Sequence, residues 1–172
     1  ERFTVWQWEQ ELFDGSYKTF ESVTRDDVST VIAVTKDKKL LFLEETQAGK
    51  ESVYTFPSGT LEKEDTEESC ARRELLEETG YQTDNLVFWY SKSAGNSVDF
   101  KYHIFIAKDC SRISEQQLDP GERISIKEMS LDEILEQIES IRFKNSTLYP
   151  ILIKAKYSED YRRELQTLLG IN

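Results

Sequence analysis

The sequence predicts a mixed α/β sandwich, and three observations support this fold class. Short segments rich in β-branched and aromatic residues recur as far as Met129, as expected for strands. A segment at 65–79 without Gly or Pro interrupts them with the composition of a helix. Two further stripes of apolar residues with helical spacing end the chain. With 172 residues, of which 38% are hydrophobic, we expect one compact domain over 1–172.

The first two segments predict an antiparallel hairpin. Residues 3–13 are dense in aromatic side chains, which favours a strand. Asp14-Gly15-Ser16 is a turn signal, and Tyr17–Thr24 is the expected partner strand. A two-stranded hairpin is marginally stable in water. We therefore distinguish this arm, residues 1–27, which we do not expect to be stable alone, from a core formed by residues 28–172.

More strands follow the arm. Val28–Thr35 and 40–44 are joined by a polar turn, and the short strand 53–56 stops at Pro57. Beyond the first helix, 86–90 and 100–107 predict strands around the loop 91–98, and 124–129 predicts one more.

The helices carry recognisable end signals. For the segment 65–79 we expect Asp65 as the N-cap, Glu68 as its capping-box partner and Gly80 as the C-terminal stop. Ser130 with Glu133 predicts a second capping box. The last two helical stripes begin near Leu148, with Pro150 tolerated in the first turn, and near Tyr161, with Gly170 as the stop. They complete the helices of the sandwich.

Charge excludes several classes of partner. Lys and Arg number 22 against 33 Asp and Glu, which gives a net charge of −11. A nucleic-acid backbone or an anionic membrane surface needs a basic footprint, so we expect neither partner. The apolar runs are too short to span a bilayer. Cys70 and Cys110 have no metal-ligand spacing and fit two reduced thiols in a cytoplasmic protein.

One flank of the predicted helix 65–79 carries three glutamates. At 100° per residue, Glu74, Glu77 and Glu78 lie within about 100° of one another. Like charges at this spacing repel, and a shared cation would remove that penalty. Only oxygen ligands are offered, which selects Mg²⁺ or Mn²⁺ over Zn²⁺. Such helices are also common as solvated faces, and Glu68–Arg72 is an ordinary surface pair, so the cluster alone does not decide between the two readings.

The wider pattern around this cluster is more specific. Gly59, an acid at Asp65, and then Arg73-Glu74-Leu75, Glu77-Glu78 and Gly80-Tyr81 resemble the Nudix box, although the family usually has Glu where this chain has Asp65. Pro57-Ser58-Gly59 and the hairpin residues 19–25 are similar to the branch of ADP-ribose pyrophosphatases and nucleoside diphosphate sugar hydrolases. The resemblance spans residues 3 to 140. It implies a Nudix-type α/β/α sandwich with a mixed β-sheet and an N-terminal antiparallel β-hairpin arm.

The resemblance also implies roles for residues of the box and of the stretch Asp119-Pro120-Gly121-Glu122. Glu74, Glu78 and the Ser58 carbonyl are the expected Mg²⁺ ligands, with Mn²⁺ as a substitute. Glu77 and Glu122 are expected as further ligands or as the base that takes a proton from water, and these two roles stay open. Arg73 sits beside the cluster and is expected to orient Glu77.

The arm is implied to contribute to substrate binding. Phe20 and Arg25 match positions that stack on the nucleobase and meet the diphosphate, with Trp6 or Trp8 as a second stacking face. Each of these residues also has a simpler interpretation. Phe20 would belong to the core, the two tryptophans would pack at an interface, and Arg25 would neutralise Asp26 or Asp27. Such arms cross to a partner subunit, so the resemblance implies a homodimer. The lone histidine, His103, is expected to be structural.

The implied activity is Mg²⁺-dependent hydrolysis of the diphosphate linkage in an ADP-ribose or nucleoside diphosphate sugar type of substrate. The products are a nucleoside monophosphate and a sugar phosphate. The alternatives are hydrolysis of nucleoside triphosphates or dinucleoside polyphosphates, and a nucleotide-sensing module without turnover. ADP-ribose pyrophosphatases usually carry an Arg after the strand before the box. This chain has none at 44–49, and Lys50 is the nearest substitute, which favours nucleoside diphosphate sugars over ADP-ribose itself.

Overall fold

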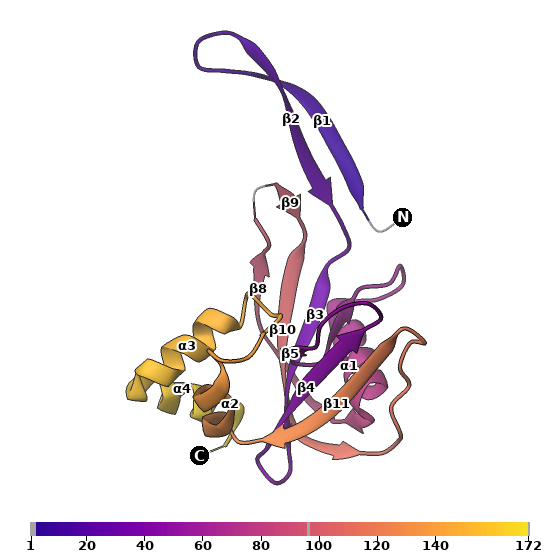
Figure 1. Ribbon diagram of the computed structural model, residues 1–172, viewed down its shortest axis with the longest axis vertical. Coiled ribbons are helices and arrows are strands. Elements are labelled where there is room, and N and C mark those ends of the chain that lie inside the picture. The colour runs from indigo at the N-terminus through magenta and orange to yellow at the C-terminus, as the bar shows by residue number, and fades with distance from the viewer. Residues whose placement is uncertain (1–2, 96, 172) are drawn as a thin grey trace.

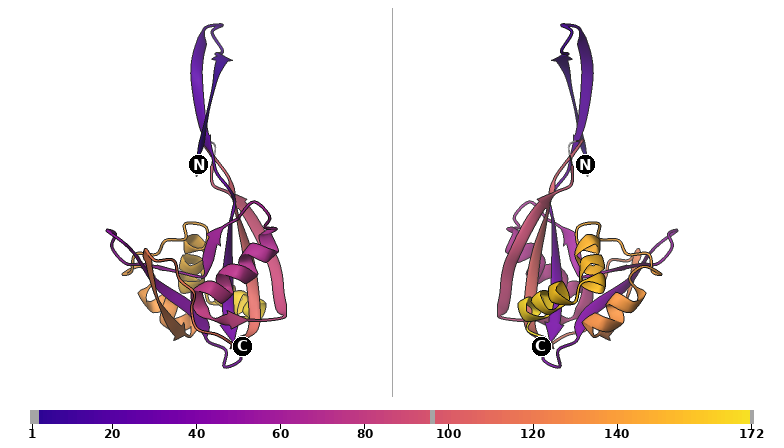
Figure 2. Two further views of the ribbon diagram at one scale, coloured as in Figure 1. Left: turned by 90° about the vertical axis from the view of Figure 1, so that its right-hand side faces the viewer. Right: turned by 90° about the vertical axis from the view of Figure 1, so that its left-hand side faces the viewer.

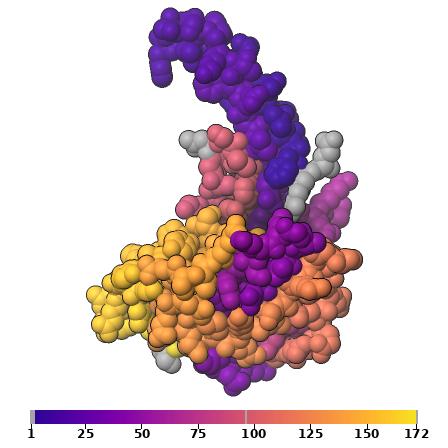
Figure 3. Space-filling model, in the orientation of Figure 1, coloured from indigo at the N-terminus to yellow at the C-terminus, as the bar shows by residue number. Residues whose placement is uncertain are grey.

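The N-terminal strands form a long hairpin that projects from the remainder of the molecule (Figures 1 and 3). In this computed structural model, which describes residues 3–95 and 97–171, β1 (Thr4–Glu11) pairs antiparallel with β2 (Tyr17–Thr24) along its whole length. All eight residues of β1 are exposed. A short parallel pairing ties the end of β2 to β9 (Val98–Asp99). The predicted hairpin and its turn are therefore confirmed.

The core is built on a mixed sheet. Its strands run in the order β11-β4-β3-β10-β7, with β5 on β4, β6 on β3 and β8 on β10. β3 and β10 are parallel, and every other neighbouring pair in this sheet is antiparallel. The bounds of its strands are Val28–Thr35 for β3, Leu40–Gln47 for β4, Val53–Thr55 for β5, Ser58–Thr60 for β6, Tyr81–Gln82 for β7, Asn85–Ser93 for β8, Lys101–Arg112 for β10 and Glu122–Met129 for β11.

Helices cover both faces of this sheet (Figure 2). One face packs on α1 (Glu67–Thr79), where Val31 and Ala33 of β3 meet Leu75. The other face packs on α2 (Leu131–Gln137), α3 (Tyr149–Tyr157) and α4 (Glu159–Leu169), where Ile32 and Val34 join the larger core cluster. Alternate residues of β3 thus enter opposite cores, which explains why its middle, residues 31–34, is continuously apolar. The α/β/α sandwich predicted for the chain is confirmed.

The start of α1 corrects one expectation. Thr66, not Asp65, is the N-cap, and Ser69, not Glu68, completes the capping box. The Asp65 carboxylate is engaged elsewhere, because it accepts hydrogen bonds from the Glu62 backbone N–H and from Arg73. The helix therefore begins one residue later than the sequence signal suggested.

The other helix signals agree with the structure. Gly80 ends α1 in the left-handed conformation, with φ 74°. Ser130 and Glu133 form the expected capping box of α2, Pro150 lies in the first turn of α3, and Gly170 ends α4. Strand β8 extends beyond 90 because residues 91–93 pair with 101–103, and β10 extends beyond 107 because residues 111–112 pair with β7. Within the described residues, the helices are too short or too polar to cross a bilayer.

Three of the remaining side chains behave as the sequence suggested. Cys70 and Cys110 are free and buried. His103 is buried and lies 2.8 Å from a carboxylate oxygen of Asp27, whose other oxygen accepts a hydrogen bond from the Lys101 backbone. His103 of β10 thus contacts the residue that precedes β3, which is a structural role.

Candidate active site

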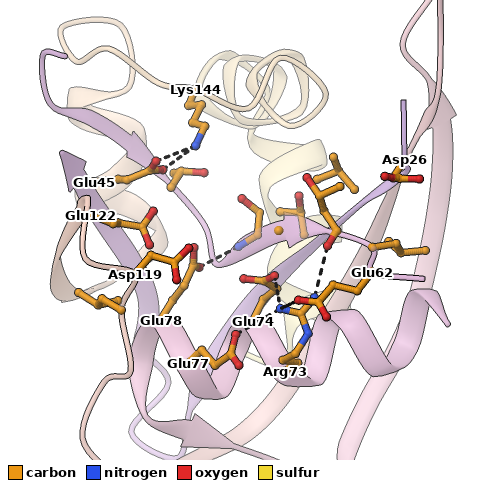
Figure 4. A pocket seen from close by; sticks show the side chains of 18 of the residues that line it. Asp26, Glu45, Glu62, Arg73, Glu74, Glu77, Glu78, Asp119, Glu122 and Lys144 are labelled. Atoms are coloured by element: carbon orange, nitrogen blue, oxygen red, sulfur yellow. Dashed lines mark hydrogen bonds and ion pairs between the residues drawn. The ribbon is translucent and has the colours of Figure 1, made fainter. Parts of the chain in front are cut away.

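A polar cleft of about 870 Å³ opens beside α1. Its walls come from α1, from the β6 region, from β4 and the start of β11, and from the segment that precedes α3. The size suits a ligand of nucleotide dimensions. Acidic side chains dominate its lining (Figure 4).

The structure brings the predicted glutamates together in this cleft. Glu74, Glu77 and Glu78 reach it from one flank of α1, and Glu122 reaches it from the first position of β11 (Figure 4). Ser58, the predicted carbonyl ligand, also lines the cleft. Glu78 and Glu122, which are 44 positions apart in the sequence, thus line the same cleft.

Glu78 is the most enclosed of these carboxylates. Its exposure is 6%, and one oxygen accepts a hydrogen bond of 2.9 Å from the Ser58 backbone N–H. Burial, reinforced by the charge of Glu74, raises the pKa of Glu78 well above its usual value. Burial likewise raises the pKa of Glu74. The folded chain therefore holds negative charge here that no neighbouring cation fully offsets.

Gly59 makes room for Glu74. A Cβ atom built on Gly59 would lie 1.8 Å from Oε1 of Glu74, so any other residue would displace that carboxylate. The requirement is one of close approach, which gives a physical reason for glycine at this position of the box.

Arg73 binds the acidic cluster from the side. Its guanidinium lies 2.7 Å from Glu74, 3.2 Å from Glu77 and 2.8 Å from Asp65, and it also donates to the Thr60 carbonyl. The expected pairing with Glu77 is present. Arg73 holds the pKa of Asp65 below its usual value. The shorter acid Asp65 therefore serves the Arg73 network, and Arg73 fastens the β6–α1 loop to the helix.

Glu122 is fixed by its strand and by a neighbouring loop. It pairs in register with Gln47 of β4, which brings it close to Glu45. Burial and the charge of Glu45 raise the pKa of Glu122. The side-chain amide of Gln116 donates to the carbonyls of Glu78 and Ile124, and so joins the end of α1 to β11. Gln116 carries no motif, and the sequence analysis missed it.

The arm residues do not all reach the cleft. Arg25 lines it, donates to Thr60 Oγ1 at 2.8 Å and lies over the Phe100 ring at 4.8 Å. Trp6, Trp8 and Phe20 lie on the projecting hairpin, outside the residues that line the cleft of their own chain. Phe20 is 40% exposed, so it is not a core residue, and its ring faces Trp8 across the hairpin at 6.0 Å.

The donor set fits a hard divalent cation. It consists of carboxylates and a backbone carbonyl, which are oxygen ligands. In the described residues, no three acidic, His or Cys side chains are yet arranged to share one ion. Glu74 and Glu77 instead turn toward Arg73. A cation would have to draw Glu74 from Arg73, while it would relieve the buried charge of Glu78.

Comparison with known proteins decides the family. The model of the NUDIX domain matches residues 24–150, which is most of the chain. The chain belongs to the Nudix family. It is a Nudix pyrophosphohydrolase of the type represented by ADP-ribose pyrophosphatases, and Nudix hydrolases in general require a divalent metal ion and act on small nucleotide-like molecules.

Two relatives and one solved structure are similar to this Nudix chain over most of its length. It is 32% identical over 139 residues to the methanol dehydrogenase activator of Bacillus methanolicus, covering 79% of this chain and 75% of the relative. It is 31% identical over 136 residues to the ADP-ribose pyrophosphatase of Bacillus subtilis (strain 168), covering 76% and 72%. A crystal structure of an ADP compounds hydrolase superposes with a TM-score of 0.71 at 20% identity, covering 99% of this chain and 89% of the other, which shows the shared fold.

Proposed function

We propose that this Nudix enzyme hydrolyses the diphosphate linkage of a nucleoside diphosphate derivative of the ADP-ribose or nucleotide-sugar type, with Mg²⁺ as cofactor. The products would be a nucleoside monophosphate and a sugar phosphate. The observation that carries the proposal is the meeting of Glu74, Glu77 and Glu78 of one helix with Glu122 of a distant strand in one cleft. The 31% identity to an ADP-ribose pyrophosphatase supports the substrate class.

Glu74, Glu78 and the Ser58 carbonyl are the residues we assign to Mg²⁺, with Mn²⁺ as a substitute. A divalent cation at these ligands supplies Lewis acidity and offsets the charge that builds on the phosphate during hydrolysis. Arg73 orients Glu74 and Glu77 through its hydrogen bonds.

Glu122 is our choice for the general base that takes the proton of the attacking water, with Glu77 as the alternative. One Glu77 oxygen already accepts a hydrogen bond from Arg73. Burial raises the pKa of Glu122, and a higher pKa makes a carboxylate a stronger base.

The nucleotide half of the substrate is assigned to the Arg25 side of the cleft. Arg25 would meet the diphosphate, and Phe20 with Trp6 or Trp8 would stack on the base. Since these rings are exposed on the hairpin and outside the cleft of their own chain, the proposal includes a homodimer in which the arm serves the partner. We place the enzyme in the cytoplasm, because two free buried thiols fit a reducing compartment.

A substrate panel tests the reaction. Purified chain is incubated with ADP-ribose, several nucleoside diphosphate sugars, nucleoside triphosphates and dinucleoside polyphosphates, with and without Mg²⁺, and products are separated by chromatography. We expect monophosphate release from the first two groups, loss of activity with a chelator, and recovery with Mg²⁺ or Mn²⁺. Chelator-resistant turnover, or preference for triphosphates, contradicts the proposal.

A second candidate function comes from the other relative. The name methanol dehydrogenase activator describes an effect on another enzyme, and the 32% identity to that protein motivates the same test here. The chain would be added to a purified methanol dehydrogenase while alcohol oxidation is followed. An accelerated rate that disappears with Glu78→Gln would support this function, whereas an unchanged rate would remove it.

A further inference from the structure

Four basic side chains line the described part of the cleft, and they differ in the groups that they already contact. Arg73 is bonded to three carboxylates. Arg25 packs on Phe100 and donates to Thr60. Lys63 is exposed on the loop between β6 and α1. The fourth, Lys144, comes from the segment before α3 and has no part in the machinery described above.

Both the ammonium group and the backbone of Lys144 form hydrogen bonds. Its ammonium lies 2.6 and 2.9 Å from the two carboxylate oxygens of Glu45. Its backbone N–H donates to the Tyr54 carbonyl, while the Tyr54 N–H donates to the Arg142 carbonyl, both at 2.8 Å. The Lys144 segment therefore continues the sheet beyond β5. A side chain fixed in this way loses little conformational entropy when it binds a ligand.

Glu45 is placed to position this lysine. Its exposure is 3%, whereas the Lys144 side chain is 47% exposed and lines the cleft. One Glu45 oxygen also accepts a hydrogen bond from Gln47. An ammonium has three N–H donors. Two point to Glu45, which leaves one for a group that enters the cleft.

The location of the pair gives the identity of that group. Lys144 and Glu45 lie on one side of the cleft and Asp26 on the other, with Glu74 and Glu78 between them (Figure 4). Arg25, the neighbour of Asp26, is an arm residue that lines this side of the cleft. A diphosphate centred on the glutamates therefore directs one half toward Arg25 and the other half toward Lys144. By contrast, Lys50, the first cation after β4 in the sequence, bonds Gln47 and is outside the cleft lining.

We propose that Lys144, positioned by Glu45, binds the sugar-phosphate half of the substrate. This inference rests on the proposed function and adds a specificity-determining residue to it. The charge of Lys144 is largely offset by Glu45, so the lysine acts as a directed hydrogen-bond donor to a phosphate or sugar oxygen. The nucleotide half, at the Arg25 side, does not touch it.

The two products of ADP-ribose hydrolysis, AMP and ribose 5-phosphate, separate the two halves. With Mg²⁺ present, Lys144→Met is expected to raise the inhibition constant of ribose 5-phosphate and the KM for ADP-ribose by about tenfold, the effect of one charge-assisted hydrogen bond. The inhibition constant of AMP is expected to change by less than about threefold, because the nucleotide half does not touch Lys144. Lys144→Arg, which keeps a donor, should recover part of the loss.

Controls separate binding from folding. Lys144→Met leaves Glu45 buried without its partner, so the double variant Glu45→Gln/Lys144→Met removes both charges and should show the same rise in the inhibition constant of ribose 5-phosphate. Lys156→Met is the matched control, because Lys156 pairs with Glu139 at 2.6 Å outside the cleft lining. It is expected to leave all constants unchanged. Melting curves confirm that each variant is folded.

Titration calorimetry with ribose 5-phosphate and Mg²⁺ decides the inference without turnover. Equal affinity of wild type and the folded double variant, no binding to wild type, or a parallel loss for AMP would overturn the role of Lys144. A wild-type chain that cleaves no diphosphate contradicts the proposed function instead. The two failures are therefore distinguishable.

Discussion

A carboxylate that is 6% exposed, as Glu78 is, destabilises a folded chain unless a cation shares its charge. Burial raises the pKa of Glu78 above its ordinary value of 4.5, so the folded state binds more protons than the unfolded state between 4.5 and the raised value. The free energy of unfolding of the metal-free chain should consequently fall as the pH rises through that window. Mg²⁺ should restore it, because the cation binds the folded state.

Glu78→Gln tests this account and the ligand role together. It removes the charge and keeps the size, so metal-free stability at a pH above the raised pKa of Glu78 should equal or exceed that of wild type, and the stabilisation by Mg²⁺ should shrink. Turnover should fall roughly a hundredfold or more, since a metal ligand is lost. Thermal melting and initial rates measure these effects. Glu68→Gln, exposed on the same helix, is the control; rates within a few-fold of wild type for Glu78→Gln would show that it is not a ligand.

Which site residues a sequence can reveal depends on how they are connected. Glu74, Glu77 and Glu78 share one helix, so their spacing alone predicts a common flank. Lys144 and Glu45 are 99 residues apart and meet only through the pairing of the Lys144 segment with β5. No local pattern encodes that meeting. Gln116 is hidden for the same reason, because its partners are backbone carbonyls of two distant elements.

At the scale of elements, the N-terminus of α1 shows where local signals compete. Asp65 and Thr66 are both good N-cap residues, and the sequence analysis chose the first. Arg73, two turns along the helix, draws the Asp65 carboxylate away, and Thr66 caps instead. The sequence underestimates the lengths of β8 and β10 for a related reason, because polar residues 91–93 of β8 and 111–112 of β10 are held by cross-strand pairing and not by burial.

The capping assignment gives a measurable difference between two neighbouring residues. Thr66→Ala removes the side chain that accepts the Ser69 N–H, and should lower the free energy of unfolding by about 1 kcal/mol. Glu68→Ala removes only the surface pair with Arg72 and should cost about 0.5 kcal/mol or less. Urea unfolding monitored by circular dichroism compares them. A larger cost for Glu68→Ala would reassign the cap.

For the whole molecule, the order of strands and helices predicted the sandwich because apolar periodicity reports which faces are covered. Residues 31–34 of β3 are continuously apolar because both faces of this strand are buried. The hairpin was equally visible from its turn and its aromatic residues. The position of the hairpin relative to the cleft was not predictable from the sequence. Trp6, Trp8 and Phe20 are exposed, so no pattern of burial indicates what they pack against.

The arm therefore leaves a question of assembly that a complementation experiment answers. Large apolar side chains are exposed all along it, from Val5 at 61% to Phe13 at 114%, and such a surface marks an interface. If the arm serves a partner's cleft, Trp8→Ser/Phe20→Ser should raise the KM by about tenfold or more through lost stacking on the base. Light scattering should find the wild-type chain as a dimer.

Co-expression then distinguishes a shared site from a site within one chain. A heterodimer of the arm variant with a Glu78→Gln chain contains one intact cleft only if the arm crosses over, because the wild-type arm of the second chain then serves the wild-type cleft of the first. Mixed dimers should regain a wild-type KM in up to one of their two sites, whereas each variant alone stays impaired. Mixed dimers no more active than the sum of their parents would show that the arm acts on its own cleft, and a monomeric wild-type chain would remove the exchange altogether.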